Sequence, residues 1–468
     1  MSGLEASIEK MRGEGLPDAA VDAFALYYRR LAEGEQGMLP EAELEPVEDV
    51  QDSAELPDDE ERAAAALDRT VVIKLNGGLG TSMGMTKAKS LLEVKDGHTF
   101  LDLIARQVLH LRERYGARLP LVLMNSFRTR DDSLAALAEH DGLEADVPLD
   151  FIQGKVPKLL VEDLEPASWP DDPEHEWTPP GHGDIYTSLA GSGMLDRLLE
   201  AGYEYAFISN SDNLGAVVEP RVLAWFAAED LPFAMEVCPR TEADKKGGHI
   251  ARRREEGGLV LRETAQTPDD DVAAFEDTER HPYFNTNNLW VNLRALKAVL
   301  DERDGVLGLP MIVNRKTVDP TDSRSPEVFQ LESAMGAAIG EFEGASAVLV
   351  PRGRFVPVKK TSDLLVVRSD AYELTDDWRI ELVAERDGSI PLVDLDDHFK
   401  LLGDFEERFA QGPPSLREAD RLSVSGDVAF GRDVTVRGTV WIEHDGDERL
   451  VIEDGTLLEG NSDWRAAG

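Results

Sequence analysis

Short apolar segments that end in polar or glycine-rich loops alternate with helical patterns from about residue 66 onward. Such segments cover residues 71–75, 121–124 and 205–209. A helical pattern starts at Thr99, with apolar residues three to four positions apart. Alternating strands and helices favour a mostly parallel sheet covered by helices, with ligands at the carboxyl ends of its strands. We therefore predict an α/β, Rossmann-like fold for residues 66–370.

The first 65 residues have a different character. Residues 18–33 form an amphipathic pattern in which Asp18, after Pro17, is the expected helix cap. This pattern predicts a docking helix without a chemical role. Residues 41–62 are strongly acidic and are expected to form a solvated linker. Residues 1–65 are thus interpreted as a helical extension and an acidic linker.

A six-residue repeat marks the C-terminal part of the chain. Two apolar series follow it, Leu422, Val428, Val434 and Val440, and Val424, Phe430, Val436 and Ile442. Gly426 and Gly438 occupy equivalent turn positions. Two inward positions per six-residue rung are typical of a parallel β-helix. We predict a linker and a β-helix domain over residues 371–468, with a structural or assembly role that would allow a homo-oligomer.

The charge balance restricts the partners of the chain. It contains 49 Lys and Arg against 92 Asp and Glu, for a net charge of −43. Such a surface repels nucleic acids and anionic membranes, and we expect neither as a partner. Any phosphate site must therefore be locally basic, rich in backbone N–H groups or bridged by a metal.

Cysteine content and hydropathy indicate the compartment. The only cysteine, Cys238, lies in an apolar run, so an intramolecular disulfide framework is excluded and core packing is expected. The sequence has no apolar signal region at its start and no run of about 18 apolar residues. We expect a soluble, cytoplasmic protein.

The strongest motif directly follows the first predicted strand. Residues 75–84 read LNGGLGTSMG, and Lys87 and Lys89 follow closely. Glycines let several backbone N–H groups turn toward one anion, and a nearby ammonium adds positive charge. The spacing matches neither the dinucleotide fingerprint nor the P-loop, so we predict a phosphate loop of another type.

Two further motifs have the composition of ligand-binding loops. Residues 179–186 read PPGHGDIY and lead into a helical pattern, which places free N–H groups and His182 near a ligand. Residues 209–215 read SNSDNLG at the end of a predicted strand. A carboxylate there suits a magnesium ion that bridges substrate phosphates, although an Asx turn would have the same sequence.

The last two motifs lie later in the chain. Residues 284–290 read FNTNNLW, and their amides suit sugar hydroxyls or a turn network. Residues 355–363 read FVPVKKTSD and place two adjacent lysines after an apolar run. In so acidic a chain, this lysine pair indicates a function more than surface decoration.

Together these stretches resemble the eukaryotic-type UTP–glucose-1-phosphate uridylyltransferase (UDP-glucose pyrophosphorylase) family. The resemblance covers residues 70–370 and includes the stretches LNGGLGTSMG, PGHGDIY, FNTNNLW and TSDLL in their shared order. It implies a nucleotidyltransferase sheet of GT-A type followed by a left-handed parallel β-helix. The implied substrates are UTP and glucose 1-phosphate, and the implied cofactor is Mg²⁺.

The resemblance also assigns roles to individual residues. Leu75, Asn76, Gly77 and Gly78 would hold the uridine and phosphate side, with Gln153 and the backbone of Gly181 reading uracil. His182, Asn210 and Asn287 match residues that contact the sugar phosphate, and Glu263 would accept from glucose hydroxyls. Asp212 matches the metal ligand, and Lys89 and Lys359 the lysines that act on the phosphates.

One segment departs from the family pattern. Members usually carry Cys-Lys-Gly-Pro-Lys-Ser after the glycine-rich loop, whereas residues 85–90 read MTKAKS. The final Lys-Ser is kept and the Gly-Pro pair is absent. The loop conformation and the role of Lys87 therefore do not follow from the resemblance.

The implied reaction needs no protein nucleophile. A phosphate oxygen of glucose 1-phosphate attacks the α-phosphorus of UTP in line and pyrophosphate leaves, so catalysis is positioning and charge stabilisation. Two alternatives remain at this point, a uridylyltransferase for galactose or N-acetylglucosamine 1-phosphate and a sensor of nucleotide sugars without turnover. The missing dinucleotide fingerprint disfavours a nicotinamide dehydrogenase.

Overall fold

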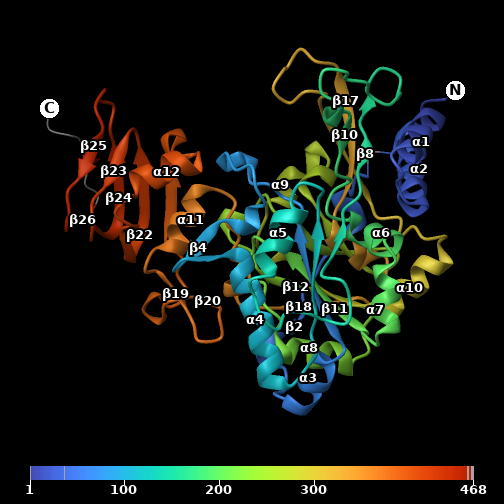
Figure 1. Ribbon diagram of the computed structural model, residues 1–468, viewed down its shortest axis with the longest axis horizontal. Helices are drawn as coiled ribbons and strands as arrows, with labels where there is room; N and C mark the ends of the chain where they lie inside the picture. The colour runs from blue at the N-terminus through green and yellow to red at the C-terminus, as the bar shows by residue number, and fades with distance from the viewer. Residues whose placement is uncertain (1, 36, 461–462, 465–468) are drawn as a thin grey trace.

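A mostly parallel sheet forms the centre of the computed structural model, which describes residues 2–35, 37–460 and 463–464 (Figure 1). Its strand order is β2 (Gln51–Asp52), β18 (Ser346–Leu349), β12 (Phe233–Pro239), β15 (Tyr283–Asn292), β11 (Tyr205–Asn210), β3 (Thr70–Asn76), β6 (Leu121–Asn125) and β7 (Asp150–Ile152). Neighbouring strands are parallel except where β15 pairs with β11 and β12. The predicted α/β fold is confirmed.

Helices cover both faces of this sheet and create two apolar cores. One core receives α6 (Asp184–Gly191), α7 (Met194–Glu200) and α10 (Leu293–Glu302). The other receives α3 (Glu60–Leu67), α4 (Phe100–Tyr115) and α8 (Pro220–Ala228). Alternating residues of a strand serve the two cores, so Ile73 points into the first and Val72 into the second. The predicted helix start at Thr99 is confirmed, because its side chain caps α4.

The N-terminal helices α1 (Gly3–Gly13) and α2 (Asp18–Ala32) lie at the opposite end of the molecule from the C-terminal strands (Figure 1). Phe24 and Tyr28 of α2 are buried in a cluster with Leu331. The helix cap is Pro17, without a side-chain bond, so the expected capping by Asp18 is wrong. Asp18 is instead the first helical residue, where its charge suits the positive end of the helix dipole.

The acidic stretch 41–62 is not simply the solvated linker expected from its composition. Its strand β1 (Leu44–Pro46) pairs with β13 (His249–Arg253), and β2 forms an edge of the central sheet. Glu41 accepts from the guanidinium of Arg262, which is fully buried. The acidic residue compensates a buried positive charge far away in the sequence, which composition alone does not reveal.

Several small sheets accompany the central sheet. One contains β16 (Met311–Thr317), β17 (Glu327–Ser333) and β9 (Leu159–Leu160), and another contains β8 (Val156–Pro157) and β10 (Trp177–Thr178). The strand β14 (Leu259–Arg262) pairs with β13, which joins β15. On the C-terminal side, α11 (Thr361–Arg368), β19 (Tyr372–Leu374) and β20 (Ile380–Leu382) lead to the last group of strands.

Parallel strands stack in the C-terminal part of the chain. The main stack is β21 (Leu392–Leu395), β22 (Ser415–Ser425), β24 (Thr435–Glu443) and β26 (Leu457–Glu459), with β27 (Asp463–Trp464) beside β24 and β23 (Val428–Phe430) paired with β25 (Leu450–Ile452). Leu422 pairs with Val440, three six-residue repeats further on. The repeat residues named above are buried, and Gly426 and Gly438 have positive φ. Among the described residues, no helix is long and apolar enough to span a membrane.

Candidate active site

The carboxyl ends of three adjacent parallel strands bring the sequence motifs together. Leu75 of β3 pairs with Asn210 of β11, and Asn76 pairs with Asn125 of β6. The backbone N–H of Gln153, just after β7, donates to the carbonyl oxygen of Asn125 (2.8 Å). The glycine-rich loop, the 209–215 loop and the segment of Gln153 therefore lie at one edge of the sheet, as the parallel topology predicts.

The side chain of Asn76 is buried at this edge of the sheet. Its side chain is only 1% exposed, and its Nδ2 donates to Oδ1 of Asn125 and to Oγ of Ser133, at 2.8 Å each. A buried, bonded amide is not free for a substrate. The Asn76 side chain thus fixes the ends of neighbouring strands, and only its backbone can take part in the expected nucleotide contact.

The glycine-rich loop folds back on itself after Gly77. A Cβ at Gly77 would lie 2.7 Å from Oε1 of Gln153, so these two residues are in close contact. The N–H of Lys89 donates to the carbonyl oxygen of Gly78 (2.9 Å), which closes the loop. Gly80 adopts φ 68°, a left-handed conformation that side chains disfavour. Lys87 is exposed, whereas Lys89 is partly buried.

Lys89 and Asp212 form an ion pair at the end of β11. Nζ of Lys89 lies 2.6 Å from Oδ2 of Asp212, and their side chains are 14% and 28% exposed. The carbonyl oxygen of Asp212 accepts from the N–H of Val358 (3.1 Å). This bond places the segment of Lys359 beside the 209–215 loop. Lys359 itself is exposed.

A metal at this edge would depend on few protein ligands. Within the described part of the chain, no group of three or more His, Cys, Asp or Glu side chains is arranged to hold a metal ion. Asp212 offers one partly exposed carboxylate where phosphates would lie. This arrangement fits Mg²⁺, which is commonly held by one or two carboxylates together with substrate phosphate oxygens. It does not fit a site in which protein side chains alone supply all the ligands and enclose the ion.

Hydrogen bonds connect the 179–186 loop to Gln153 and to Met335. Nε2 of Gln153 donates to the carbonyl oxygen of Gly181 (3.1 Å). Nδ1 of His182 accepts from the N–H of Met335 (2.9 Å), and burial lowers the His182 pKa to about 4. His182 is therefore neutral near pH 7 with its proton on Nε2, which makes it a hydrogen-bond donor without charge.

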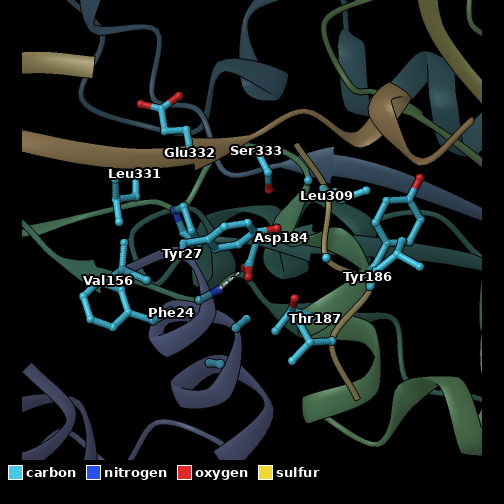
Figure 2. A pocket seen from close by; sticks show the side chains of 18 of the residues that line it. Phe24, Tyr27, Val156, Asp184, Tyr186, Thr187, Leu309, Leu331, Glu332 and Ser333 are labelled. Carbon is cyan, nitrogen blue, oxygen red and sulfur yellow. Dashed lines mark hydrogen bonds between the residues drawn. The ribbon is translucent and has the colours of Figure 1, made fainter. Parts of the chain in front are cut away.

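The carboxylate of Asp184 connects the 179–186 loop to the segment of Gln153. Its Oδ2 accepts from the N–H of Gly154 (2.7 Å) and from Oγ of Ser188 (2.6 Å). Burial raises the Asp184 pKa to about 6. Figure 2 shows Asp184 close to Tyr27 of helix α2, and both residues line the same pocket. The N-terminal helix thus lies against the 179–186 loop and the segment that follows Gln153.

Glu263 and Asn287 form a second polar group on the antiparallel side of the sheet. A Cβ at Gly248 would lie 2.6 Å from Oε2 of Glu263, and the carbonyl oxygen of Gly248 accepts from the N–H of Asn285 (3.0 Å). Asn285 in turn donates from Nδ2 to Oδ1 of Asn287 (3.0 Å), which has φ 58°. Burial raises the Glu263 pKa to about 7, opposed by the positive charge of Lys359. Glu263 and Asn287 are thus connected through Gly248 and Asn285.

The contacts above bring Gly77, Gln153 and Gly181 together in one group and Lys89, Asp212 and the segment of Lys359 in another, and they add residues without a predicted role. Asn125, Asn213 and Asp184 hold loops of the site, although sequence reasoning gave them no role. Asn213 and Asp184 do lie inside motifs that stood out by composition. Their partners are remote in sequence, as in the bond from the N–H of Val356 to Oδ1 of Asn213. Local patterns carry no signal for such pairings.

Comparisons with known proteins identify the family of the chain. The sequence profile of the family described as UTP–glucose-1-phosphate uridylyltransferase matches residues 21–437. The chain is 45% identical over 404 residues to the UTP–glucose-1-phosphate uridylyltransferase of Hordeum vulgare, covering 86% of this chain and 83% of the relative. The Saccharomyces cerevisiae enzyme of the same description is 41% identical over 394 residues, covering 84% of this chain and 77% of its own.

Solved structures extend the similarity to the whole chain. A mutant UDP-glucose pyrophosphorylase from Leishmania major, in complex with UDP-glucose, superimposes with a TM-score of 0.93 and 45% identity, and 99% of each chain is covered. A UDP-glucose phosphorylase from Trypanosoma brucei gives a TM-score of 0.89 and 46% identity over 98% of each chain. On these grounds the chain belongs to the UTP–glucose-1-phosphate uridylyltransferase family.

Proposed function

We propose that this protein catalyses the formation of UDP-glucose and pyrophosphate from UTP and glucose 1-phosphate. The observation that carries the proposal is the Lys89–Asp212 pair at the carboxyl end of β11, beside a glycine-rich loop, in a chain of this family. A carboxylate and an ammonium at this position can serve a metal ion and a phosphate respectively. The rest of the site supplies groups for the uracil and for the sugar.

The nucleotide side is formed by backbone and neutral side chains. Gln153 and the backbone of Gly181 read the uracil, since their mutual hydrogen bond places both beside Gly77. The backbone from Leu75 to Gly78 faces the ribose and the phosphates. Backbone N–H groups that turn toward one anion can bind phosphate oxygens without a charged side chain.

The sugar phosphate lies on the other side of Asp212. Asn210 and the Nε2–H of His182 donate to its phosphate, while Glu263 and Asn287 bind glucose hydroxyls. The close contact of Gly248 with Glu263 leaves the carboxylate little freedom to rotate, which favours one orientation of the sugar. Preorganised polar groups of this kind select a substrate by leaving unpaired groups when a hydroxyl is missing.

A divalent ion, Mg²⁺ in our proposal, would be held by Asp212 together with phosphate oxygens of the substrates. When bound, it neutralises phosphate charge and orients the α-phosphate for attack. Asp212 already accepts from Lys89, so this lysine exchanges its carboxylate partner for a phosphate when UTP enters. The exchange keeps both charges compensated in the free and the occupied site.

Transfer then follows from positioning. An oxygen of the glucose 1-phosphate forms a bond to the α-phosphorus, and the bond between that phosphorus and the bridging oxygen to the β-phosphorus breaks. Pyrophosphate leaves with the electron pair of the broken bond, and Lys89 and Lys359 stabilise the charge that develops. No side chain becomes covalently attached.

The remaining proposals concern the whole chain. We place its catalytic unit at residues 66–370, after an N-terminal extension over residues 1–65. The last unit, residues 371–468, is proposed as a left-handed parallel β-helix with three six-residue repeats per coil, in line with the Leu422–Val440 pairing. Its stacked strands offer a surface for a homo-oligomer. A cytoplasmic location suits the single, buried Cys238.

One assay tests the reaction and its substrate. Purified protein is mixed with UTP, Mg²⁺ and a panel of sugar 1-phosphates, pyrophosphate release is followed, and the nucleotide sugar is identified by mass. The proposal expects UDP-glucose from glucose 1-phosphate, at a higher kcat/KM than for galactose or N-acetylglucosamine 1-phosphate. Binding of UTP without pyrophosphate release on any sugar would disprove it.

A further inference from the structure

The amide of Asn213, in the loop after β11, is almost completely enclosed, with 5% of the residue exposed. Its Oδ1 accepts from the N–H groups of Gly215 (3.1 Å) and Val356 (2.8 Å). Its Nδ2 donates to Oδ1 of Asn288 (3.2 Å) and to the carbonyl oxygen of Arg354 (3.1 Å). A side-chain amide that uses both donors and both acceptor positions has one fixed orientation.

These bonds join two segments that carry different parts of the site. The N–H of Leu214 donates to the carbonyl oxygen of Val356 (3.1 Å), and the N–H of Val358 donates to that of Asp212 (3.1 Å). The backbone bonds lie on either side of the Asn213 amide. The segment that ends at Lys359 is thus paired with the loop that carries Asp212.

A buried ion pair holds the other partners of the amide in place. Glu236 is fully buried and accepts from the guanidinium of Arg354 at 2.7 Å and from Nδ2 of Asn288 at 2.9 Å. Nε1 of Trp290 also donates to Glu236 (3.1 Å). A buried carboxylate with this many donors is rigid. Asn213 therefore connects the 209–215 loop and the segment before Lys359 to a fixed part of the core.

We infer that Asn213 is a positioning residue for uridylyl transfer, which sets the spacing between the carboxylate of Asp212 and the ammonium of Lys359. The inference rests on the proposed function, which gives those two groups their roles. Asn213 acts only through them, because its amide is consumed by protein partners. Loss of the Asn213 amide should reduce kcat more than UTP affinity, because the proposed uracil-binding residue, Gln153, follows a different strand, β7.

The first test compares two asparagine variants in the full-length protein. Asn213→Ala should lower kcat by roughly ten- to a hundredfold, the effect of a misplacement near 1 Å, with the KM for UTP changed less than about threefold. Mn²⁺ binding in the presence of UTP, followed by electron paramagnetic resonance, should weaken. The control is Asn292→Ala, which removes the cap of α10 away from the site and should lower the melting temperature without lowering kcat.

A double-mutant cycle shows whether Asn213 acts through Lys359. In a Lys359→Ala background, Asn213→Ala should cost much less in kcat than in the wild type, because residues that act as a unit are not additive. An equal loss in both backgrounds would overturn the inference. So would a kcat for Asn213→Ala that matches the Asn292→Ala control.

Two further cases can be told apart, a variant that does not fold and a failure of the proposed site itself. If Asn213→Ala does not fold, Asn213→Ser is used, since a serine hydroxyl can still accept from the N–H group of Gly215, two residues further on. That variant should retain more turnover than Lys359→Ala. Turnover as low as that of Lys359→Ala, together with weaker UTP binding, would count against the inference. If Lys359→Ala keeps full turnover, the proposed site itself fails, whatever Asn213 does.

Discussion

Nζ of Lys89 donates to Oδ2 of Asp212 across 2.6 Å, which joins the end of the glycine-rich loop to the end of β11. The loop therefore has a closed arrangement before any phosphate is bound. The negative partner is the same carboxylate that the proposed function gives to the metal. In the proposed function, Lys89 leaves this carboxylate for a phosphate oxygen when UTP binds.

In the Lys89→Ala variant, the ammonium that would move from Asp212 to a phosphate oxygen is absent. We expect kcat/KM for UTP to fall at least about a hundredfold, because a preorganised charge at a transferring phosphoryl group is worth about 3 kcal/mol. Lys87→Ala is the matched control, since that exposed side chain lies two positions earlier in the same loop. Steady-state kinetics at saturating Mg²⁺ decide the matter, and equal losses in the two variants would contradict the role of Lys89.

The contact between Gly77 and Gln153 gives a prediction for the uracil. An alanine Cβ at Gly77 would lie 2.7 Å from Oε1 of Gln153 and displace the amide. We expect Gly77→Ala to raise the KM for UTP about tenfold or more, because a displaced hydrogen-bonding group loses its discrimination. At Gly78 an added Cβ meets nothing within 4 Å, so Gly78→Ala should have the smaller effect.

The order of these two effects is the diagnostic result. It is measured as the KM for UTP in both variants, with circular dichroism spectra to confirm that each is folded. A larger effect from Gly78→Ala would show that the uracil does not lie against Gln153.

Lys359 is exposed in the free protein, although the Asp212 loop holds its segment. We expect Lys359→Ala to reduce kcat at least about a hundredfold with an unchanged melting temperature, because the side chain packs against little and acts on the transferring phosphate. The neighbouring Lys360→Ala serves as the control, since Lys360 is also exposed and directly precedes α11. Near-normal turnover by purified Lys359→Ala would refute the assignment.

Much of the sheet and its ligand-binding edge could be predicted from the sequence. Buried strands have continuous apolar runs, and the loops after them contain the glycines and amides that a ligand needs. This is why the strands at residues 71–75 and 205–209 and the Lys89–Asp212 side of the site were found. The buried positions of the C-terminal strands could also be predicted, because Leu422 and Val440 belong to an apolar series with a six-residue repeat, but the pairing of these two residues does not follow from the repeat alone.

Long-range polar pairings explain what the sequence did not reveal. Glu41 lies in an acidic stretch that looked solvated, yet its partner Arg262 is fully buried more than two hundred positions away. Asn76 looked like a substrate ligand, but its side chain faces Asn125 and Ser133. The direction of an amide depends on strands that meet only in the folded chain, so no local pattern encodes it.

The buried carboxylate of Glu263 makes stability depend on pH in a defined direction. Burial raises its pKa to about 7 in the folded protein, above its ordinary value near 4.5. Between these two values the folded state binds more protons than the unfolded state, so this group's contribution to stability falls as pH rises from about 4.5 to 7. Above pH 7 the folded protein keeps a buried negative charge that Lys359 only partly offsets.

Glu263→Gln should therefore be more stable than the wild type at pH 8, and the difference should shrink as the pH is lowered toward 5. Glutamine has the same shape but no charge, so it removes the cost of the buried carboxylate while it weakens glucose 1-phosphate binding. Urea unfolding of both proteins at pH 5 and pH 8 gives the free energies of unfolding to compare. A Glu263→Gln variant that is less stable than the wild type at pH 8, or a difference that grows toward pH 5, would show that Glu263 is not held in a buried, pKa-raising environment. The same variant should show a raised KM for glucose 1-phosphate and an unchanged KM for UTP, which ties the stability measurement to the sugar side of the site.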